Sequence, residues 1–269
     1  MRLNSYRKIL LVCLFLLSVM MVLVFSGFLQ IYWVLPIVIL MILIISKCSK
    51  LQKKLDNEIT KIYSILLDEL DPKRAIAALK GVIEKEDLPK GYVTSLEYYI
   101  AISFAFAGDF EQSRVILENL LVRFPKWSIS YFQKKRRGFY AIIHKNLAGI
   151  HLEKGNLKNA KLHDQLMKNF KPRKVEQKSF EYHLLHLECA FKFSDGKYEE
   201  CLEMLESLQV GAQIKLDEVS INYRLSNIYE KLGNVPKQKE LLQSVADSGH
   251  KLHIGEIARE KLAVLERYV

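Results

Sequence analysis

The histidines of this chain are spaced in a way that could support metal binding or metal-dependent catalysis. Two His-x-x-His pairs occur, His183/His186 and His250/His253. Residues three apart lie on one face of a helix, so both rings of a pair could bind a zinc ion. Neither pair has a third ligand nearby in the sequence, and no His-Glu-x-x-His motif is present. We therefore expect no metal site and no cofactor, and a metal-dependent enzyme using these pairs is the enzyme-class alternative.

Other residues that could act as nucleophiles or hold phosphate do not form recognisable motifs. The sequence has no phosphate-cradling glycine loop, no Gly-x-Ser-x-Gly elbow and no dinucleotide-binding fingerprint. Cys189 and Cys201 are interpreted as small packing residues, because Ala would serve equally well at their positions in the pattern described below. The sequence thus favours a binding protein over an enzyme.

A basic run forms the densest cluster of positive charge in the chain. It consists of Lys134, Lys135, Arg136 and Arg137, and aromatic residues flank it on both sides. Such a run could bind anionic lipid at a membrane surface or an acidic surface of a partner. The alternative is a solvated face of a long helix, and the sequence leaves both open.

The N-terminal part of the chain is strongly apolar. Residues 9–46 contain no charged side chain, and a membrane crossing needs only about 20 helical residues. Gly27 offers a break between two apolar stretches, which predicts a transmembrane hairpin with spans at about 9–26 and 31–46. A cleaved signal peptide on residues 1–26 is the alternative, but no small-x-small cleavage site follows it.

Basic residues flank this predicted hairpin, and they predict its orientation. Seven Lys or Arg and no acidic residue occur in residues 1–54. Because basic flanks stay in the cytoplasm, we expect a multi-pass protein of the cell membrane with both termini cytoplasmic and the lipid bilayer as a partner. The remaining residues, 55–269, carry 40 − 7 = 33 basic against 30 acidic side chains. Because these residues are nearly neutral, the overall positive charge of the chain does not indicate a nucleic-acid partner, and we expect none.

A repeated pattern organises residues 55–269. A turn motif recurs at Gly108, Gly155, Gly196 and Gly233, with a weaker copy at Leu70. Each turn is followed five residues later by a small or short residue: Ala75, Ser113, Ala160, Cys201 and, least clearly, Gln238. The spacings between these positions, 38, 47, 41 and 37 residues, are typical of repeated helix pairs. Small residues allow two helices to approach closely, so the pattern predicts an all-α solenoid.

The residues within each unit resemble the tetratricopeptide repeat. In residues 141–174, Leu147 and Ala148 fall where that family has its Leu-Gly pair, Ala160 is the small contact and Pro172 ends the unit. Residues 94–127 match in the same way. The resemblance implies about five helix pairs, beginning near residues 56, 94, 141, 182 and 219. Apolar residues beside a charged face in residues 251–268 predict a C-terminal capping helix. We thus predict two domains, a membrane hairpin over 1–54 and a cytosolic repeat domain over 55–269.

The resemblance also implies a binding surface. In this family, the first helix of each repeat lines a concave groove that holds a partner protein or peptide. By position, the groove residues are Asn57, Thr60, Ser95, Tyr98, Ile102, Lys145, His183, His186, Tyr223 and Asn227. The Lys/Asn-rich clamp of chaperone-binding members is not reproduced, so an acidic C-terminal partner is not expected. The sequence as a whole favours a membrane-anchored cytosolic scaffold or adaptor, with a peptide-sensing regulator as the alternative.

Overall fold

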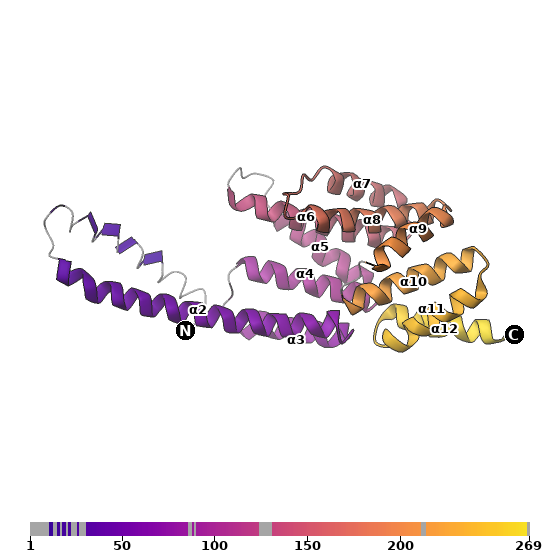
Figure 1. Ribbon diagram of the computed structural model, residues 1–269, viewed down its shortest axis with the longest axis horizontal. Coiled ribbons are helices and arrows are strands. Elements are labelled where there is room, and N and C mark those ends of the chain that lie inside the picture. Colours follow the sequence, from indigo (N-terminus) through magenta and orange to yellow (C-terminus); the bar gives the residue numbers. More distant parts are fainter. Residues whose placement is uncertain are drawn as a thin grey trace. The chain divides into compact units, whose positions relative to one another are not determined.

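The computed structural model describes residues 31–85, 88, 90–123, 131–210 and 214–267, together with residues 11, 12, 15, 16, 18, 19, 21, 22 and 26. Over these residues the regular structure is entirely α-helical (Figure 1), which confirms the all-α prediction. The helices are α2 (Ile31–Leu67), α3 (Pro72–Lys85), α4 (Lys90–Phe106), α5 (Phe110–Arg123), α6 (Tyr131–Glu153), α7 (Leu157–Lys168), α8 (Gln177–Ser194), α9 (Tyr198–Val210), α10 (Lys215–Lys231), α11 (Val235–Ser248) and α12 (His253–Arg267).

The chain divides into two compact units. The smaller unit combines residues 1–63 with 77–96, and the larger unit combines residues 64–76 with 97–269. In the smaller unit, Leu55, Ile59 and Ile62 are buried and recur at helical spacing along α2. The hydroxyl of Tyr92 donates to the carboxylate of Asp56 over 2.8 Å within the same unit. The predicted domain boundary between residues 54 and 55 stays a prediction.

The predicted membrane hairpin requires correction. Many residues of its first span, 9–26, lie outside the described residues. Where the structure does describe the chain, no helix has both the length and the apolar character needed to cross a membrane. Residues 31–46 belong to α2, which does not end at the predicted interface but continues to Leu67 through the charged segment containing Lys47, Lys50 and Lys53. The two-span hairpin and the multi-pass location in the cell membrane are therefore wrong, and the predicted bilayer partner is unsupported.

The repeat turns of the larger unit share one backbone conformation. The residues Leu70, Gly108, Gly155, Gly196 and Gly233 all have a left-handed φ, between 55° and 86°. This conformation ends a helix by turning the chain, and it favours glycine because a Cβ atom is crowded there. Leu70 adopts it without being glycine, and its side chain is buried. All five predicted turns thus lie at the predicted positions.

The residue after each turn begins the second helix of a pair. At four of the five turns this residue is Asp or Asn, and its side chain accepts a hydrogen bond from the backbone N–H three residues later, as the oxygen of Asn156 does from Asn159 over 3.2 Å. Such a cap satisfies a donor that the helix itself leaves unpaired. The small positions Ala75, Ser113, Ala160 and Cys201 are completely buried, and Gln238 is 5% exposed. The predicted helix pairing and register are confirmed.

Three core clusters connect these helices in chain order. Each cluster draws buried side chains from three consecutive helices, so the helix pairs from α4 to α10 are packed against one another, as in a solenoid. The clusters are Ala101, Leu117, Leu120, Ile143, Leu147 and Ile150 on α4 to α6; Ala141, Ala148, Met167, Phe180 and Leu187 on α6 to α8; and Cys189, Cys201, Leu205, Leu208, Ile221, Leu225 and Ile228 on α8 to α10.

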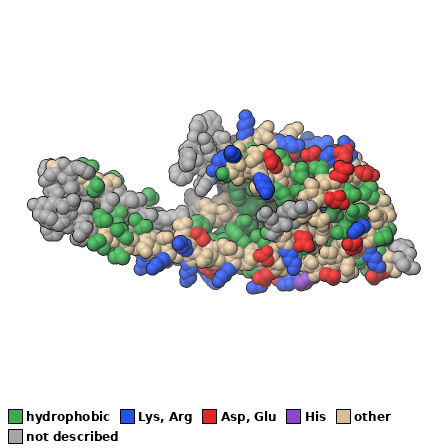
Figure 2. Space-filling model, viewed as in Figure 1, with side chains coloured by type: hydrophobic (Ala, Val, Ile, Leu, Met, Phe, Trp, Pro, Cys, Tyr) green, Lys and Arg blue, Asp and Glu red, His purple; other side chains and the backbone are tan. Residues whose placement is uncertain are grey.

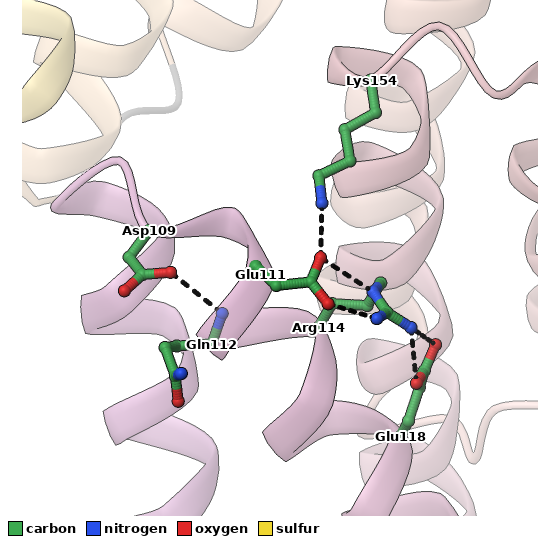
Figure 3. A network of polar contacts seen from close by, with 6 residues as sticks. All are labelled: Asp109, Glu111, Gln112, Arg114, Glu118 and Lys154. Carbon is green, nitrogen blue, oxygen red and sulfur yellow. Dashed lines mark hydrogen bonds and ion pairs between the residues drawn. The ribbon is translucent and has the colours of Figure 1, made fainter.

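Charged side chains are scattered over the surface, between polar and hydrophobic areas (Figure 2). Figure 2 shows Lys and Arg interleaved with Asp and Glu on the face that it presents. One network links α5 to the end of α6 (Figure 3): Glu111 pairs with Arg114 and accepts from Lys154 over 2.7 Å, and Arg114 pairs with Glu118 over 2.8 Å. The Arg114 and Lys154 donors hold the pKa of the Glu111 carboxyl at about 2. Because Glu111 is exposed, this network contributes orientation more than stability.

The last helix of the larger unit contacts the first turns of the same unit. The Lys251 ammonium pairs with the Asp71 carboxylate over 2.9 Å, although 180 positions separate the two residues. The ring of His253, at the start of α12, lies edge-on to Phe110 with ring centroids 6.1 Å apart. The same ring covers Gly108 so closely that a Cβ atom built there would come within 2.7 Å of it. Residues that begin and end this unit in sequence therefore meet in space, and we call these contacts the end-to-end joint.

Candidate functional site

Three first helices of consecutive pairs, α6, α8 and α10, bring charged and polar side chains together. We call this group the Lys145–Arg224 cluster. Helices α6 and α8 contact each other, and hydrogen bonds connect α8 with α10. The cluster comprises Lys145 from α6, Tyr182, His183 and His186 from α8, and Asp217 and Arg224 from α10.

Hydrogen bonds fix the α8 and α10 members of the cluster. The Tyr182 hydroxyl donates to the Asp217 carboxylate over 3.1 Å. One guanidinium nitrogen of Arg224 donates to the backbone carbonyl of His186 over 3.3 Å and lies 3.5 Å from its Nδ1. The Tyr182 and His186 rings meet edge to face, with centroids 4.6 Å apart. Since a guanidinium can only donate, its contact with Nδ1 is compatible with a neutral His186 that carries its proton on Nε2.

Burial keeps both histidines of the cluster neutral. Burial, with the positive charges of Arg224 and Lys145 and the neighbouring His183, lowers the pKa of His186 to about 2. Burial and Lys145 lower the pKa of His183 to about 4. His186 is 8% exposed, and its Nε2 has no hydrogen-bond partner among the described residues; the same holds for Nδ1 of His183. The cluster therefore contains buried polar atoms that no described residue satisfies, which is uncommon and costly.

The charged members of the cluster compensate one another only in part. Burial, followed by the charge of Arg224, lowers the pKa of the Lys145 ammonium to about 8, and Asp217 acts in the opposite direction. Burial raises the pKa of Asp217, although the Tyr182 hydroxyl and Lys145 oppose this shift. Within the described part of the chain, neither Lys145 nor Arg224 is at ion-pair distance from a carboxylate. The cluster thus holds two cations and one anion in a poorly hydrated environment.

The predicted groove residues are distributed over both units. Asn57, Thr60 and Ser95 belong to the smaller unit, where Asn57 and Thr60 are exposed and Ser95 is half-buried. In the larger unit, Lys145, His183 and His186 come together in the cluster, whereas Ile102 is half-buried on α4.

Two tyrosines of the predicted groove have different surroundings. The Tyr98 ring packs against the core cluster of α4 to α6, 5.0 Å from the Phe139 ring, and its hydroxyl accepts from Asn146 over 3.0 Å. Burial raises the pKa of Tyr98. Tyr223 is half-buried on α10, near Asn227, which in turn accepts from Lys261 over 2.7 Å. The surroundings of Tyr98 are those of a packing residue, while those of Tyr223 suit a surface contact.

The basic run at residues 134–137 lies in the first half of α6. The side chains of Lys134, Lys135, Arg136 and Arg137 are outside the described part of the structure. Their role as a partner patch therefore stays a prediction.

The other histidines are arranged in ways that the sequence pattern did not indicate. His253 belongs to the end-to-end joint. A separate group joins His144 and His151 of α6 with His163 of α7: the Nδ1 atoms of His144 and His163 are 2.7 Å apart, and the His151 and His163 rings stack at 5.4 Å. Burial lowers the pKa of all three, that of His144 to about 4. No group of three or more His, Cys, Asp or Glu side chains suited to a metal ion occurs among the described residues.

Three members of the cluster were missed by the sequence reasoning: Tyr182, Asp217 and Arg224. A signal for two of them was present, because Asp217 and Arg224 are seven residues apart and therefore lie on one face of a helix. The rotation of α10 about its axis, which turns this face toward α8, is not encoded in the spacing. Only the packed structure brings Arg224 to His186.

Comparison with known proteins agrees with the arrangement of the helices. The tetratricopeptide repeat model matches residues 95–126, which include most of α4 and all of α5. A search of curated proteins finds no match to the chain. Tetratricopeptide repeats are in general non-enzymatic modules that bind other proteins. The match covers one helix pair, and together with the paired helices it supports a helical-repeat arrangement similar to that of tetratricopeptide repeats.

Proposed function

We propose that this chain is a scaffold or adaptor that binds a protein or peptide partner along the first helices of its repeats. The observation that carries the proposal is the Lys145–Arg224 cluster, in which three such helices bring together charged side chains and two buried histidine nitrogens that have no partner among the described residues. A folded protein tolerates such groups at a cost, and a partner that satisfies them recovers that cost on binding. We further propose residues 55–269 as the interacting region and the basic run at 134–137 as a second candidate surface.

Site-specific photo-crosslinking in the native cell tests this proposal. A photoreactive phenylalanine analogue replaces Tyr223 or Asn227 on the first helix α10, and in control variants it replaces Lys239 or Gln243 on the second helix α11, where both are exposed. We expect a discrete crosslinked partner from the α10 positions and none from the α11 positions. Equal crosslinking from both helices, or crosslinking from α11 alone, would contradict binding along the first helices.

A second candidate function, a peptide-sensing regulator, is favoured by the end-to-end joint. Because α12 contacts the first turns of the same unit, a peptide bound to the intervening first helices could tighten or open the joint and so change a downstream contact. Spin labels at exposed Asn119 of α5 and Glu260 of α12 would report this change. A distance that shifts when partner is added supports the regulator, and an unchanged distance supports the simple scaffold.

A further inference from the structure

We propose that three histidines between α6 and α7 act as an acid-sensitive contact, which holds α7 on α6 near neutral pH and releases it on acidification. The three are His144 and His151 of α6 and His163 of α7, and we call them the α6–α7 histidine group. The inference goes beyond the proposed function and does not depend on it, because none of these rings belongs to the Lys145–Arg224 cluster.

The contact between two of the rings requires that at least one of them is neutral. Nδ1 of His144 lies 2.7 Å from Nδ1 of His163, so one atom donates a proton and the other accepts it with its lone pair. If both rings were protonated, two N–H groups would face each other across this distance. The His151 ring stacks on His163 with centroids 5.4 Å apart, so a charge on it would also be close. Acid therefore places like charges in a contact that suits neutral rings.

Burial adds to the cost of charging these rings. His144 is 2% exposed and His151 is 7% exposed. Nε2 of His144 has no hydrogen-bond partner among the described residues, and the Tyr140 ring packs edge-on against it with centroids 4.4 Å apart. A proton taken up here creates a charge that water cannot hydrate. Burial accordingly lowers the pKa of His144 to about 4, and it lowers the pKa of His151 and His163 as well.

The charged groups around the rings do not remove this cost. Besides burial, Glu118 of α5 raises the pKa of His151 and His163, while Arg114 of α5 and Lys154, directly after α6, lower that of His151. The Glu118 carboxylate is already paired with Arg114 over 2.8 Å. Among the described side chains, no carboxylate lies at ion-pair distance from any of the three rings. A protonated ring in this group thus lacks an anionic partner.

Helix α7 is the element that can move in response. It has 12 residues, and it packs more extensively on α6 than on any other described helix. Residues 169–176, which join it to α8, contain no helix. The core cluster of α8 to α10 draws no side chain from α7 and stays intact without it. Separation of α7 from α6 brings His144 and His163 into water, which is the least disruptive way for the chain to accept protons there.

The direction and size of the pH effect follow from proton linkage. The pKa of His144 is about 4 while α7 is in place and returns to its ordinary value of 6.5 when α7 is released. The released state therefore binds more protons, and acid favours release. Between pH 7 and pH 5 this ring alone raises the equilibrium constant for release by about 20-fold. His151 and His163 act in the same direction, because their pKa values are also lowered.

Hydrogen exchange of the full chain, followed by mass spectrometry at pH 7 and pH 5, tests the proposal. Labelling times are corrected for the intrinsic exchange rate at each pH, so that the remaining difference reports opening of the structure. We expect the amides of α7 to lose protection by about 20-fold or more at pH 5 relative to those of α11, which contains no histidine.

Substitutions connect this loss to the histidine group. His144→Gln replaces the most buried ring by a side chain that stays neutral, and it should remove most of the loss in α7. His163→Gln should also reduce the loss, and it keeps the test valid if His144→Gln does not fold, as judged by circular dichroism. His250→Gln is the matched control, because His250 is exposed and lies outside the group, and it should leave the loss unchanged.

Three results would overturn the inference. The first is equal protection of α7 relative to α11 at both pH values. The second is a loss of protection in all helices together, which would show global unfolding rather than release of α7. The third is a wild-type pH dependence in every folded Gln variant of His144 or His163. None of these results touches the proposed function, because the experiment contains no partner.

Discussion

Replacing the four turn glycines with alanine, one at a time, tests the end-to-end joint against an internal standard. Gly108, Gly155, Gly196 and Gly233 have the same left-handed backbone, with φ between 69° and 86°. Beyond its neighbours in the chain, a Cβ atom at Gly155, Gly196 or Gly233 would meet no atom within 4 Å. At Gly108 it would lie 2.7 Å from Cγ and 3.0 Å from Cδ2 and Nδ1 of the His253 ring. The four substitutions thus share a backbone cost, and only one of them also disturbs the joint.

The expected magnitudes follow from these two contributions. A left-handed backbone costs a residue with a Cβ atom about 1–2 kcal/mol. The lower entropy of the unfolded chain offsets about 0.4–1 kcal/mol of this when glycine becomes alanine. We therefore expect Gly155→Ala, Gly196→Ala and Gly233→Ala to lower the free energy of unfolding by about 1 kcal/mol each. Gly108→Ala should cost about 1–3 kcal/mol more, because the His253 ring must move away and lose its contact with Phe110.

Urea-induced unfolding of the full chain, followed by circular dichroism, measures these free energies. A second series in the His253→Ala background completes a double-mutant cycle, because the ring that meets the new Cβ atom is then absent. In that background Gly108→Ala should cost no more than the other three substitutions. The reasoning is refuted if Gly108→Ala is no more destabilising than Gly155→Ala while His253 is present, since α12 would then not lie over Gly108.

Three further predictions concern packing and pH. Ala160→Leu should destabilise the chain by about 1–3 kcal/mol in the same unfolding assay, because Ala160 is completely buried. The exposed control Lys158→Ala should have almost no effect on stability. Equal effects of the two substitutions would mean that the helix register is wrong. Tyr98→Phe should destabilise by about 1 kcal/mol through the lost hydroxyl contact with Asn146 but should leave partner crosslinking unchanged, and a loss of crosslinking with normal stability would instead place Tyr98 at the binding surface. The pKa values of His183 and His186 are lower in the folded chain than when unfolded, so the unfolded chain binds more protons and the free energy of unfolding should decrease as the pH falls from about 6.5 toward 4. His186→Gln should reduce that slope, and an unchanged slope would show that this ring is not buried neutral.

The local features of the fold could be predicted from the sequence because they depend on single residues. A glycine five positions before a small residue specifies both the left-handed turn and the close helix contact, and these positions are confirmed at Gly155 and Ala160. Even the weak copy at Leu70 was correctly identified, although Leu is an unfavourable residue for its φ of 55°. Such patterns repeat with the helix pair and are therefore visible along the chain.

Features that depend on several helices at once were not predictable. The contact between Arg224 and His186 requires a particular rotation of α10 against α8, and the contact between Lys251 and Asp71 requires the summed curvature of all the intervening pairs. The predicted membrane hairpin failed for a different reason. An uncharged run indicates apolar sequence, but it does not specify where a helix ends, and α2 continues through Lys47 to Leu67.

The end-to-end joint has a consequence for how this chain can change in evolution. Arrays in which each repeat contacts only its neighbours can gain or lose a repeat with little penalty, because every internal interface is equivalent. Here two contacts form only when the intervening helix pairs place α12 next to the first turns of the unit. They are the ion pair of Lys251 with Asp71 and the packing of the His253 ring over Gly108. Duplicating or deleting one helix pair would misplace α12 and break both contacts together. The number of repeats in this unit is therefore fixed by geometry, and variation among its descendants should accumulate in substitutions rather than in repeat copy number.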